Sequence, residues 1–241
     1  MTRIDGRTPD QLRQLEFHRG FHSNAEGSVL VCAGNTKVLC TVSITDAVPS
    51  WRKGSGKGWL TAEYAMLPGS VVGRKRREFQ KRDGRSVEIQ RLIGRALRAA
   101  LDMRGFPNST LNIDCDVLQA DGGTRCASIC GAMVAVHDAL KVLDTRGKLQ
   151  SWPLRRWIGA VSVGHVDDKV LLDLDYSEDS TADVDMNVIA TADGQLVEVQ
   201  GTAEGEPFDR AVHEQLLDMA LTGTHQIVAQ MQALVQEPVN A

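Results

Sequence analysis

The segment from Thr110 to Leu118 constrains the fold more than any other part of this chain. Apolar and polar residues alternate along it in the order Leu111, Asn112, Ile113, Asp114, Cys115, Asp116 and Val117. Alternation at period two is typical of a β-strand that buries one face. Gly122 and Gly123 follow, and the segment after them has a sequence that favours a helix to about Leu143. We therefore expect a sharp turn and then a long helix with Asp121 as its N-cap.

A second helix is predicted between Ile89 and Leu101. Its apolar residues recur at the helical spacing and form one stripe, made of Ile89, Leu92, Ile93, Ala96, Leu97, Ala100 and Leu101. The opposite face carries three arginines, which are Arg91, Arg95 and Arg98. Gly105 and Pro107 end the helix, so the first half of the chain contains a strand between two helices.

Paired β-rich runs occur in both halves of the chain. In the first half, residues 28–44 flank Gly34-Asn35, which favours a hairpin, and a further strand is expected at 59–66. The second half has a similar layout, with expected strands at 158–166, 170–174, 186–191 and 196–199 and a helix that begins near Pro207 and that Gly223 can interrupt. No low-complexity linker separates the halves. We expect an α+β fold with two βαβα-like halves in one compact domain, residues 1–241.

Charge is distributed unevenly along the sequence. The formal net charge of the 241 residues is −4, which excludes a uniformly basic nucleic-acid coat protein. From Arg74 to Arg91, however, eight basic residues stand against three acids, and from Asp167 to Asp185 eight acids stand against one lysine. These segments are either solvated loops or a polyanion-binding arm and an acidic catalytic or metal site. Because the basic segment lacks apolar periodicity before Val87, we expect an exposed, mobile loop there.

The composition favours a cytoplasmic protein that does not enter a membrane. No apolar run approaches the roughly 18 residues that cross a bilayer, and residues 1–7 contain no apolar segment typical of a secretion signal. The cysteines form no C-x-x-C pair and lie among apolar neighbours; they are Cys32, Cys40, Cys115, Cys126 and Cys130. We expect these thiols to be buried and reduced.

The turn at residues 121–125 is a candidate anion site. Glycines let the backbone approach a ligand, and the free N–H groups of a helix's first turn favour an anion. Thr124 adds a hydroxyl group and Arg125 a guanidinium fork that matches two phosphate oxygens. Arg85 precedes the start of the other helix and can offer the same chemistry. A tight turn with a solvent-exposed arginine explains the same pattern, so both interpretations stay open.

Two acids, Asp179 and Asp185, form a second candidate site. They can hold Mg²⁺ together, or one can transfer a proton while the other holds the metal; ordinary loop acids are the alternative. No nucleophile triad is apparent, and we expect His137 and His213 to be packing or helix-surface residues. The four tryptophans are too dispersed along the sequence to predict a base-stacking platform.

Longer motifs give the sequence a family resemblance. They are His22–Ile44, Gly58–Tyr64, Glu88–Arg95, Asp114–Arg125, Glu178–Asn187 and Glu198–Phe208. With them, nearly the whole chain from Asp5 to the last helix resembles the bacterial ribonuclease PH family. Members of that family are phosphate-dependent 3′→5′ exoribonucleases that trim tRNA precursors, releasing nucleoside 5′-diphosphates in a reaction that also runs backwards as 3′-end addition.

The resemblance implies roles for individual residues. The phosphate-binding residues would be Arg85, Gly123, Thr124 and Arg125, with inorganic phosphate as co-substrate. Asp179 and Asp185 would be the catalytic acids and the Mg²⁺ ligands. RNA would be bound by Arg74, Arg76 and Arg77. The sequence departs from the family at Gly69, where arginine is usual, and at Cys126 and Cys130, where threonine is usual.

The resemblance also implies a fold and an assembly. The fold is the ribonuclease PH fold, of the ribosomal protein S5 domain 2-like type, which exosome subunits and polynucleotide phosphorylase share. The expected assembly is a homohexamer built as a trimer of dimers, acting on tRNA precursors and other structured RNA 3′ ends, including rRNA. Two rival functions are a non-catalytic RNA-binding ring subunit and a metal-dependent nuclease that uses water in place of phosphate.

Overall fold

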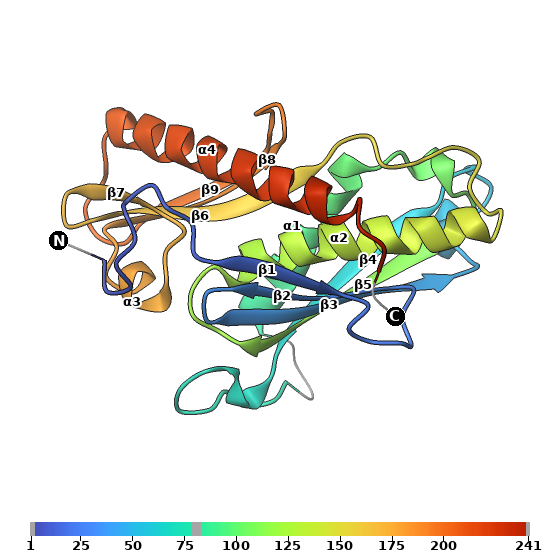
Figure 1. Ribbon diagram of the computed structural model, residues 1–241, viewed down its shortest axis with the longest axis horizontal. Helices are drawn as coiled ribbons and strands as arrows, with labels where there is room; N and C mark the ends of the chain where they lie inside the picture. The colour runs from blue at the N-terminus through green and yellow to red at the C-terminus, as the bar shows by residue number, and fades with distance from the viewer. Residues whose placement is uncertain (1–2, 79–82, 240–241) are drawn as a thin grey trace.

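Two β-sheets and the helices between and beside them make up the computed structural model of this protein (Figure 1). The structure describes residues 3–78 and 83–239. The first sheet has the order β1 (Leu15–Arg19), β2 (Gly27–Ala33), β3 (Thr36–Thr45), β5 (Thr110–Gln119) and β4 (Trp59–Met66). The second sheet has the order β7 (Lys169–Leu172), β6 (Ile158–Val166), β8 (Val184–Thr191) and β9 (Leu196–Ala203). The α-helices are α1 (Gly84–Ala100), α2 (Thr124–Thr145), α3 (Tyr176–Asp179) and α4 (Arg210–Leu234).

The alternating segment forms β5, as its pattern predicts. Leu111, Ile113, Cys115 and Val117 are at most 1 % exposed and lie on the side of the sheet that α2 contacts, whereas Asp114 and Asp116 lie on the half-exposed opposite face. The neighbouring strand β4 runs parallel to β5, with Tyr64 opposite Cys115. Parallel pairing brings the carboxyl ends of both strands to one edge of the sheet, where β5 leads into the turn before α2.

Helix α2 lies in the centre of the molecule, between the two sheets. It contacts β2 and β3 of the first sheet and β6 of the second, and β6 in turn contacts α4. Nearly every residue of β6 is buried, which indicates that helices cover both of its faces. A single large hydrophobic cluster therefore includes residues from both halves of the chain. Figure 1 shows α4 lying along the second sheet on the side away from the first.

The sequence expectation about membrane-crossing segments is corrected by α2. Among the residues that the structure describes, this one helix is long and apolar enough to cross a membrane by length and composition. Its apolar residues are interrupted by Ser128, His137 and Asp138, so the sequence shows no continuous apolar run of this length. Of its most apolar 18-residue window, 89 % is buried inside the protein, as in the core helix of a soluble domain.

The predicted break in the last helix is wrong. Helix α4 begins after its N-cap Asp209, slightly beyond Pro207, and continues through Gly223 to Leu234. A Cβ at Gly223 would lie 2.7 Å from Leu172 Cδ1. The glycine therefore allows α4 to pack closely on β7, and it has no need to interrupt the helix.

The tryptophan prediction also needs correction. Trp51 and Trp59 are eight residues apart in sequence, yet their rings pack edge to face with centroids 4.7 Å apart. Trp152 and Trp157 both contact the ring of His137, which is buried as expected for a packing residue. Dispersal along the sequence therefore did not mean dispersal in space.

The other expected elements are present. The hairpins, the strand at 59–66 and both main helices lie where their patterns predict, within a few residues at each end. Strand β1 was not expected, because its sequence is largely polar. All five cysteines are free; four are buried, as expected, whereas Cys32 is half-buried.

Candidate active site

Two consecutive glycines form the turn between β5 and α2. Both have left-handed backbones, with φ of 73° at Gly122 and 62° at Gly123. A Cβ at Gly122 would lie 2.5 Å from the carbonyl oxygen of Leu174, so the turn packs directly on the segment that precedes α3. Gly123 is the N-cap of α2 and offers no side chain to its first turn. The first N–H groups of α2 therefore remain donors for an external acceptor.

Arg13 supports this turn from beneath. Its side chain is buried, donates to the carbonyl oxygen of Asp121 at 2.6 Å and forms an ion pair with Asp173 at 2.7 Å. A Cβ at Gly123 would lie only 2.8 Å from Arg13 Nη2. A buried guanidinium thus fixes the backbone of the turn and leaves no room for a larger residue at Gly123.

Asp121 does not cap α2, so that prediction is wrong. One oxygen of its carboxylate accepts a hydrogen bond from Asn35 Nδ2 at 3.1 Å, and the other accepts from the N–H of Tyr176 at 3.3 Å. The left-handed turn places Gly123 at the cap position instead. Asp121 therefore joins the turn to β3's hairpin and to α3.

The hydroxyl of Thr124 is buried and bonded to Tyr64 of β4. The two oxygens are 2.9 Å apart. Burial raises the pKa of Tyr64, while this hydrogen bond and the charges of Arg85 and Arg125 oppose the shift. Arg85 and Arg125 therefore lie close enough to Tyr64 to act on it electrostatically, which brings the starts of α1 and α2 to one place.

The two arginines differ in how they are held. Arg125 is largely buried, donates to Gln200 Oε1 of β9 at 2.8 Å and lies 3.6 Å from Glu88 of α1. Arg85 is exposed, and its N–H donates to Asp83, the N-cap of α1, at 3.2 Å. Arg125 is thus fixed in position, whereas no side-chain contact within residues 3–78 and 83–239 holds the guanidinium of Arg85.

Asp179 and Asp185 face these arginines. Burial raises the pKa of Asp179, and the charges of Arg85 and Arg125 act against that rise. Burial also raises the pKa of Asp185, and the negative charges of Asp179 and Glu204 raise it further. A carboxylate whose charge raises the pKa of a second one lies close to it, so the structure brings Asp179 and Asp185 together beside the phosphate-binding candidates.

The two acids fit a hard cation such as Mg²⁺ in their chemistry. The charges of Arg85 and Arg125 act on Asp179, and that of Arg125 acts on Asp185, without an ion pair to either carboxylate within residues 3–78 and 83–239. Mg²⁺ is commonly bound by one or two carboxylates and several waters. No group of three or more His, Cys, Asp or Glu residues in the described part of the chain is arranged to hold a metal.

An N-terminal arginine holds the segment that carries Asp179. Arg3 donates two hydrogen bonds of 2.7 Å to the carboxylate of Glu178, the residue before Asp179. Asp175 and Glu178 also form a capping box at the start of α3. Contacts of the residues that precede Asp179 therefore hold the helix that positions it.

The predicted RNA-binding residues lie in the segment before α1. Arg74, Arg76 and Arg77 are exposed, which agrees with the expected exposed loop, and Arg74 has a left-handed backbone with φ of 60°. Lys75 forms ion pairs with Glu78 at 3.0 Å and Asp83 at 3.1 Å. Lys81 and Arg82 of the same basic segment lie outside the described residues. No contact in the described part of the chain joins the three arginines to Arg85 or Arg125.

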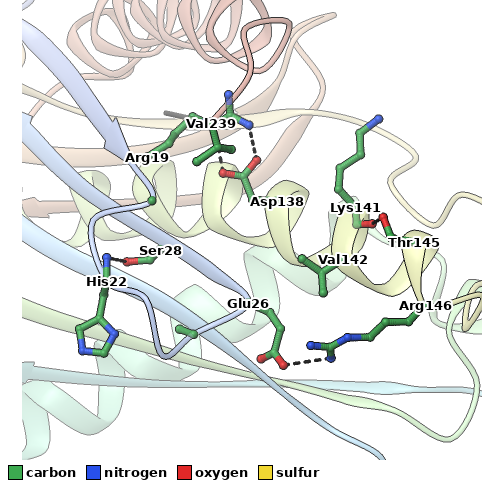
Figure 2. A pocket seen from close by; sticks show the side chains of 12 residues that line it. Arg19, His22, Glu26, Ser28, Asp138, Lys141, Val142, Thr145, Arg146 and Val239 are labelled. Carbon is green, nitrogen blue, oxygen red and sulfur yellow. Dashed lines mark hydrogen bonds and ion pairs between the residues drawn. The ribbon is translucent and has the colours of Figure 1, made fainter. Parts of the chain in front are cut away.

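A separate cavity of about 500 Å³ lies beside the second half of α2 (Figure 2). Its two arginines are already paired, Arg19 with Asp138 at 2.6 Å and Arg146 with Glu26 at 3.0 Å, and its lysine, Lys141, lies over the ring of Trp152. Since these pairs are neutralised and lie toward the opposite end of α2 from Gly123, the cavity does not contribute to the site described above.

Comparisons with known proteins identify the family. The model of the 3′ exoribonuclease family matches with its domain 1 at residues 11–141 and with its domain 2 at residues 157–223. Ribonuclease PH of Corynebacterium glutamicum (strain R) is 54 % identical over 234 residues, covering 96 % of each chain. Ribonuclease PH of Mycobacterium leprae (strain Br4923) is 55 % identical over 237 residues, covering 97 % of this chain and 92 % of that one. The chain belongs to the ribonuclease PH family of 3′ exoribonucleases.

Solved structures agree on the fold of this ribonuclease PH relative. Rice (Oryza sativa) Rrp46 matches with a TM-score of 0.79 at 19 % identity, covering 97 % of this chain and all of that one. The Archaeoglobus fulgidus exosome with RNA bound to the active site matches with a TM-score of 0.78 at 24 % identity, covering 95 % and 92 % of the two chains. The α+β ribonuclease PH fold expected from the sequence is confirmed.

Sequence reasoning missed several residues that build the site of this family member. Arg13, Tyr64 and Gln200 hold the turn, Thr124 and Arg125 respectively. Tyr64 and Gln200 lie within the motifs at 58–64 and 198–208, but nothing in their spacing indicates these contacts. A buried arginine such as Arg13 leaves no signal in the sequence, because its partner Asp173 is 160 residues away.

Proposed function

We propose that this ribonuclease PH relative trims the 3′ ends of tRNA precursors and other structured RNAs, including rRNA, by phosphorolysis. It would release nucleoside 5′-diphosphates and, in reverse, add nucleotides. The observation that carries the proposal is the convergence of Arg85 and Arg125, at the starts of α1 and α2, on the same site as Asp179 and Asp185. An anion site beside paired acids is what an attacking phosphate and a leaving 3′ oxygen require.

Inorganic phosphate would be held by Arg85, Arg125, the hydroxyl of Thr124 and the N–H groups that follow Gly123. It attacks the phosphorus of the last phosphodiester bond, and the bond to the 3′ oxygen of the preceding nucleotide breaks. The attacking and scissile phosphates are both anions, so catalysis depends on positive charge and alignment more than on a nucleophilic side chain. The N-terminal ends of α1 and α2 would supply the positive charge and hold the phosphate in line for attack.

The two acids would act on the leaving group. The raised pKa of Asp185 favours its protonated form, which suits a general acid that gives a proton to the departing 3′ oxygen. When ionised, Asp185 and Asp179 would instead hold Mg²⁺. A bound Mg²⁺ would neutralise charge on the scissile phosphate; the residues of the chain provide its ligands and their orientation.

We also propose which residues bind RNA, how the chain is organised into domains and how it assembles. Arg74, Arg76 and Arg77 would bind RNA backbone, since they are exposed and close to α1 in sequence. The chain, residues 1–241, would fold as one domain, because one hydrophobic cluster includes residues from both family segments. A homohexamer in the cytoplasm is supported by the likeness to the archaeal exosome core and by the free thiols.

The test uses a tRNA that carries extra 3′ nucleotides, incubated with and without inorganic phosphate. We expect nucleoside diphosphates to be released only when phosphate is present. Release of monophosphates without phosphate would indicate a hydrolytic nuclease, and no release would indicate a non-catalytic subunit. Arg125→Ala and Asp185→Ala should each abolish turnover while the assembly persists; near-normal activity in either would contradict the assignment of site residues.

A further inference from the structure

Two tryptophans and two arginines form a cluster at the protein surface, far from the phosphate-binding turn. Arg52 lies over both rings, 5.4 Å from the centroid of Trp51 and 5.0 Å from that of Trp59, and Arg98 lies 4.8 Å from the centroid of Trp59. We call Trp51, Arg52, Trp59 and Arg98 the tryptophan–arginine surface. It joins the segment before β4 to the last turn of α1.

Trp51 is the exposed member of this surface, whereas Arg52, Trp59 and Arg98 are half-buried, and the two arginines give it excess positive charge. Trp51 is 63 % exposed, although a tryptophan that serves only the core is normally buried. Neither Arg52 nor Arg98 forms an ion pair with an acid in the described part of the chain; each donates to a backbone carbonyl, of Gly58 and Leu60 respectively. Both guanidiniums are therefore held in place without being neutralised.

Neighbouring charges reinforce the positive potential. Lys53 and Lys57 are exposed beside the cluster. The nearby acid Asp102 is already paired with both Arg104 and Arg155. Flat aromatic rings next to unpaired cations are the combination with which proteins bind single-stranded nucleic acids, since bases stack on the rings and phosphates contact the cations.

The distance between the tryptophan–arginine surface and the proposed phosphate site indicates which part of a bound RNA strand would reach the surface. Arg98 follows Arg85 by thirteen residues along α1, which corresponds to about 20 Å at about 1.5 Å per residue. Arg91 and Arg95 lie between them on the exposed face of the helix, although Arg95 is bonded to Glu198. A stacked single strand with about 3.4 Å per nucleotide covers this distance in roughly six nucleotides.

We propose that the tryptophan–arginine surface binds single-stranded RNA about six nucleotides upstream of the 3′ end being trimmed, with a base stacked on Trp51. This inference rests on the proposed function, which places the 3′ terminus near Arg85 and Arg125. It predicts that the enzyme distinguishes substrates by the length of their unpaired 3′ tail. Tails too short to reach the surface gain nothing from it.

The test compares a three-nucleotide and a ten-nucleotide single-stranded RNA with the same 3′ sequence. Trp51→Ala should raise KM for the longer RNA by about 5- to 150-fold, the range for loss of one stacked base, and leave kcat on both RNAs and KM for the shorter one unchanged. Trp51→Phe should retain most of the wild-type affinity. Phe21→Ala removes another exposed aromatic ring, 53 % exposed, and should change neither KM.

Direct binding of the ten-nucleotide RNA, measured by fluorescence anisotropy, gives a readout that does not depend on turnover. Arg52→Gln should lower the slope of log Kd against log salt by about 0.7, as for one lost phosphate contact on a single strand. Unchanged affinity in both variants, or equal losses for both RNA lengths, would overturn the proposal. A changed sedimentation coefficient of Trp51→Ala would assign the surface to a subunit contact and would also overturn it. If the wild type releases no diphosphate from any RNA, the proposed function fails, whereas wild-type activity with an inert Trp51 refutes only this inference.

Discussion

Gly122→Ala tests whether the phosphate-binding turn and the acidic segment are packed directly on each other. The matched control is Gly147→Ala, because φ is 73° at Gly122 and 65° at Gly147, so both substitutions impose the same left-handed strain. The surroundings differ. A Cβ at Gly122 would lie 2.5 Å from the oxygen of Leu174 and 2.7 Å from the carbonyl carbon of Asp175, whereas nothing lies within 4 Å at Gly147.

The expected magnitudes follow from this difference. Left-handed strain costs an alanine about 1–2 kcal/mol, and about 1 kcal/mol lowers Tm by roughly 2–4 °C in a domain of this size. Gly147→Ala should therefore lower Tm by roughly 2–8 °C. At Gly122 the obstacle is backbone, which cannot rotate away, so overpacking should add about 1–3 kcal/mol to the loss.

The activity of the two variants should differ more sharply than their stability. To relieve the clash, the turn must move away from Asp175, the N-cap of the helix that ends in Asp179. Loss of one charge-assisted hydrogen bond to phosphate would raise KM for phosphate by about tenfold or more. We would measure Tm by calorimetry and initial rates against phosphate concentration, at one protein concentration. Equal Tm values and equal KM values for phosphate in Gly122→Ala and Gly147→Ala would refute the reasoning.

Three further predictions concern charge and reactivity. Asp185→Asn should lower kcat by about 10²- to 10⁴-fold. Because the pKa of Asp185 is raised in the folded protein, the ionised carboxylate lowers the stability of the wild type once the pH rises through that pKa. The variant should therefore melt at an equal or higher temperature than wild type at neutral pH, and the difference should disappear in acid. A lower Tm of the variant at neutral pH would contradict this. Replacing Arg74, Arg76 and Arg77 together with glutamine should reduce the salt slope of RNA binding by about 2 without changing KM for phosphate, and an unchanged slope would exclude them from the RNA interface. Burial raises the pKa of the Cys130 thiol to about 12, so a thiol reagent should label only the half-buried Cys32 in the native protein, and a second fast-reacting thiol would contradict the structure.

The fold was predictable where side-chain periodicity reports burial. The alternation at 110–118 reflects one buried face, and the stripe at 89–101 reflects one buried side of a helix. Periodicity says less where burial is complete. Helix α2 was predicted within a few residues, but it is buried almost all round, so the sequence does not show that polar residues such as Ser128 and Asp138 lie inside the protein. Gly223 was misread as a helix break because the sequence does not show how closely α4 approaches Leu172.

The candidate site was predictable only in part. The glycine turn has a local signature, since left-handed backbone demands residues such as Gly122 and Gly123. Aspartate is a residue type that favours the N-cap position, yet the left-handed turn places Gly123 there. The carboxylate of Asp121 instead accepts hydrogen bonds from Asn35 and Tyr176. Contacts of this kind join residues that are far apart in sequence, and no local pattern encodes them.

The two halves of the site are tied together by the N-terminal segment, which has no predicted element of its own. Phosphate-binding residues come from residues 85–125, and the paired acids come from the second half of the chain. Arg13 bonds both to the turn, at the oxygen of Asp121, and to Asp173, which precedes the acidic helix. Arg3 bonds to Glu178, next to Asp179. These are buried guanidinium contacts, in which loss of one partner leaves an unpaired buried charge. In the proposed mechanism, the distance between the attacking phosphate and the general acid would therefore depend on residues 3–13 as well as on the residues that touch the substrate.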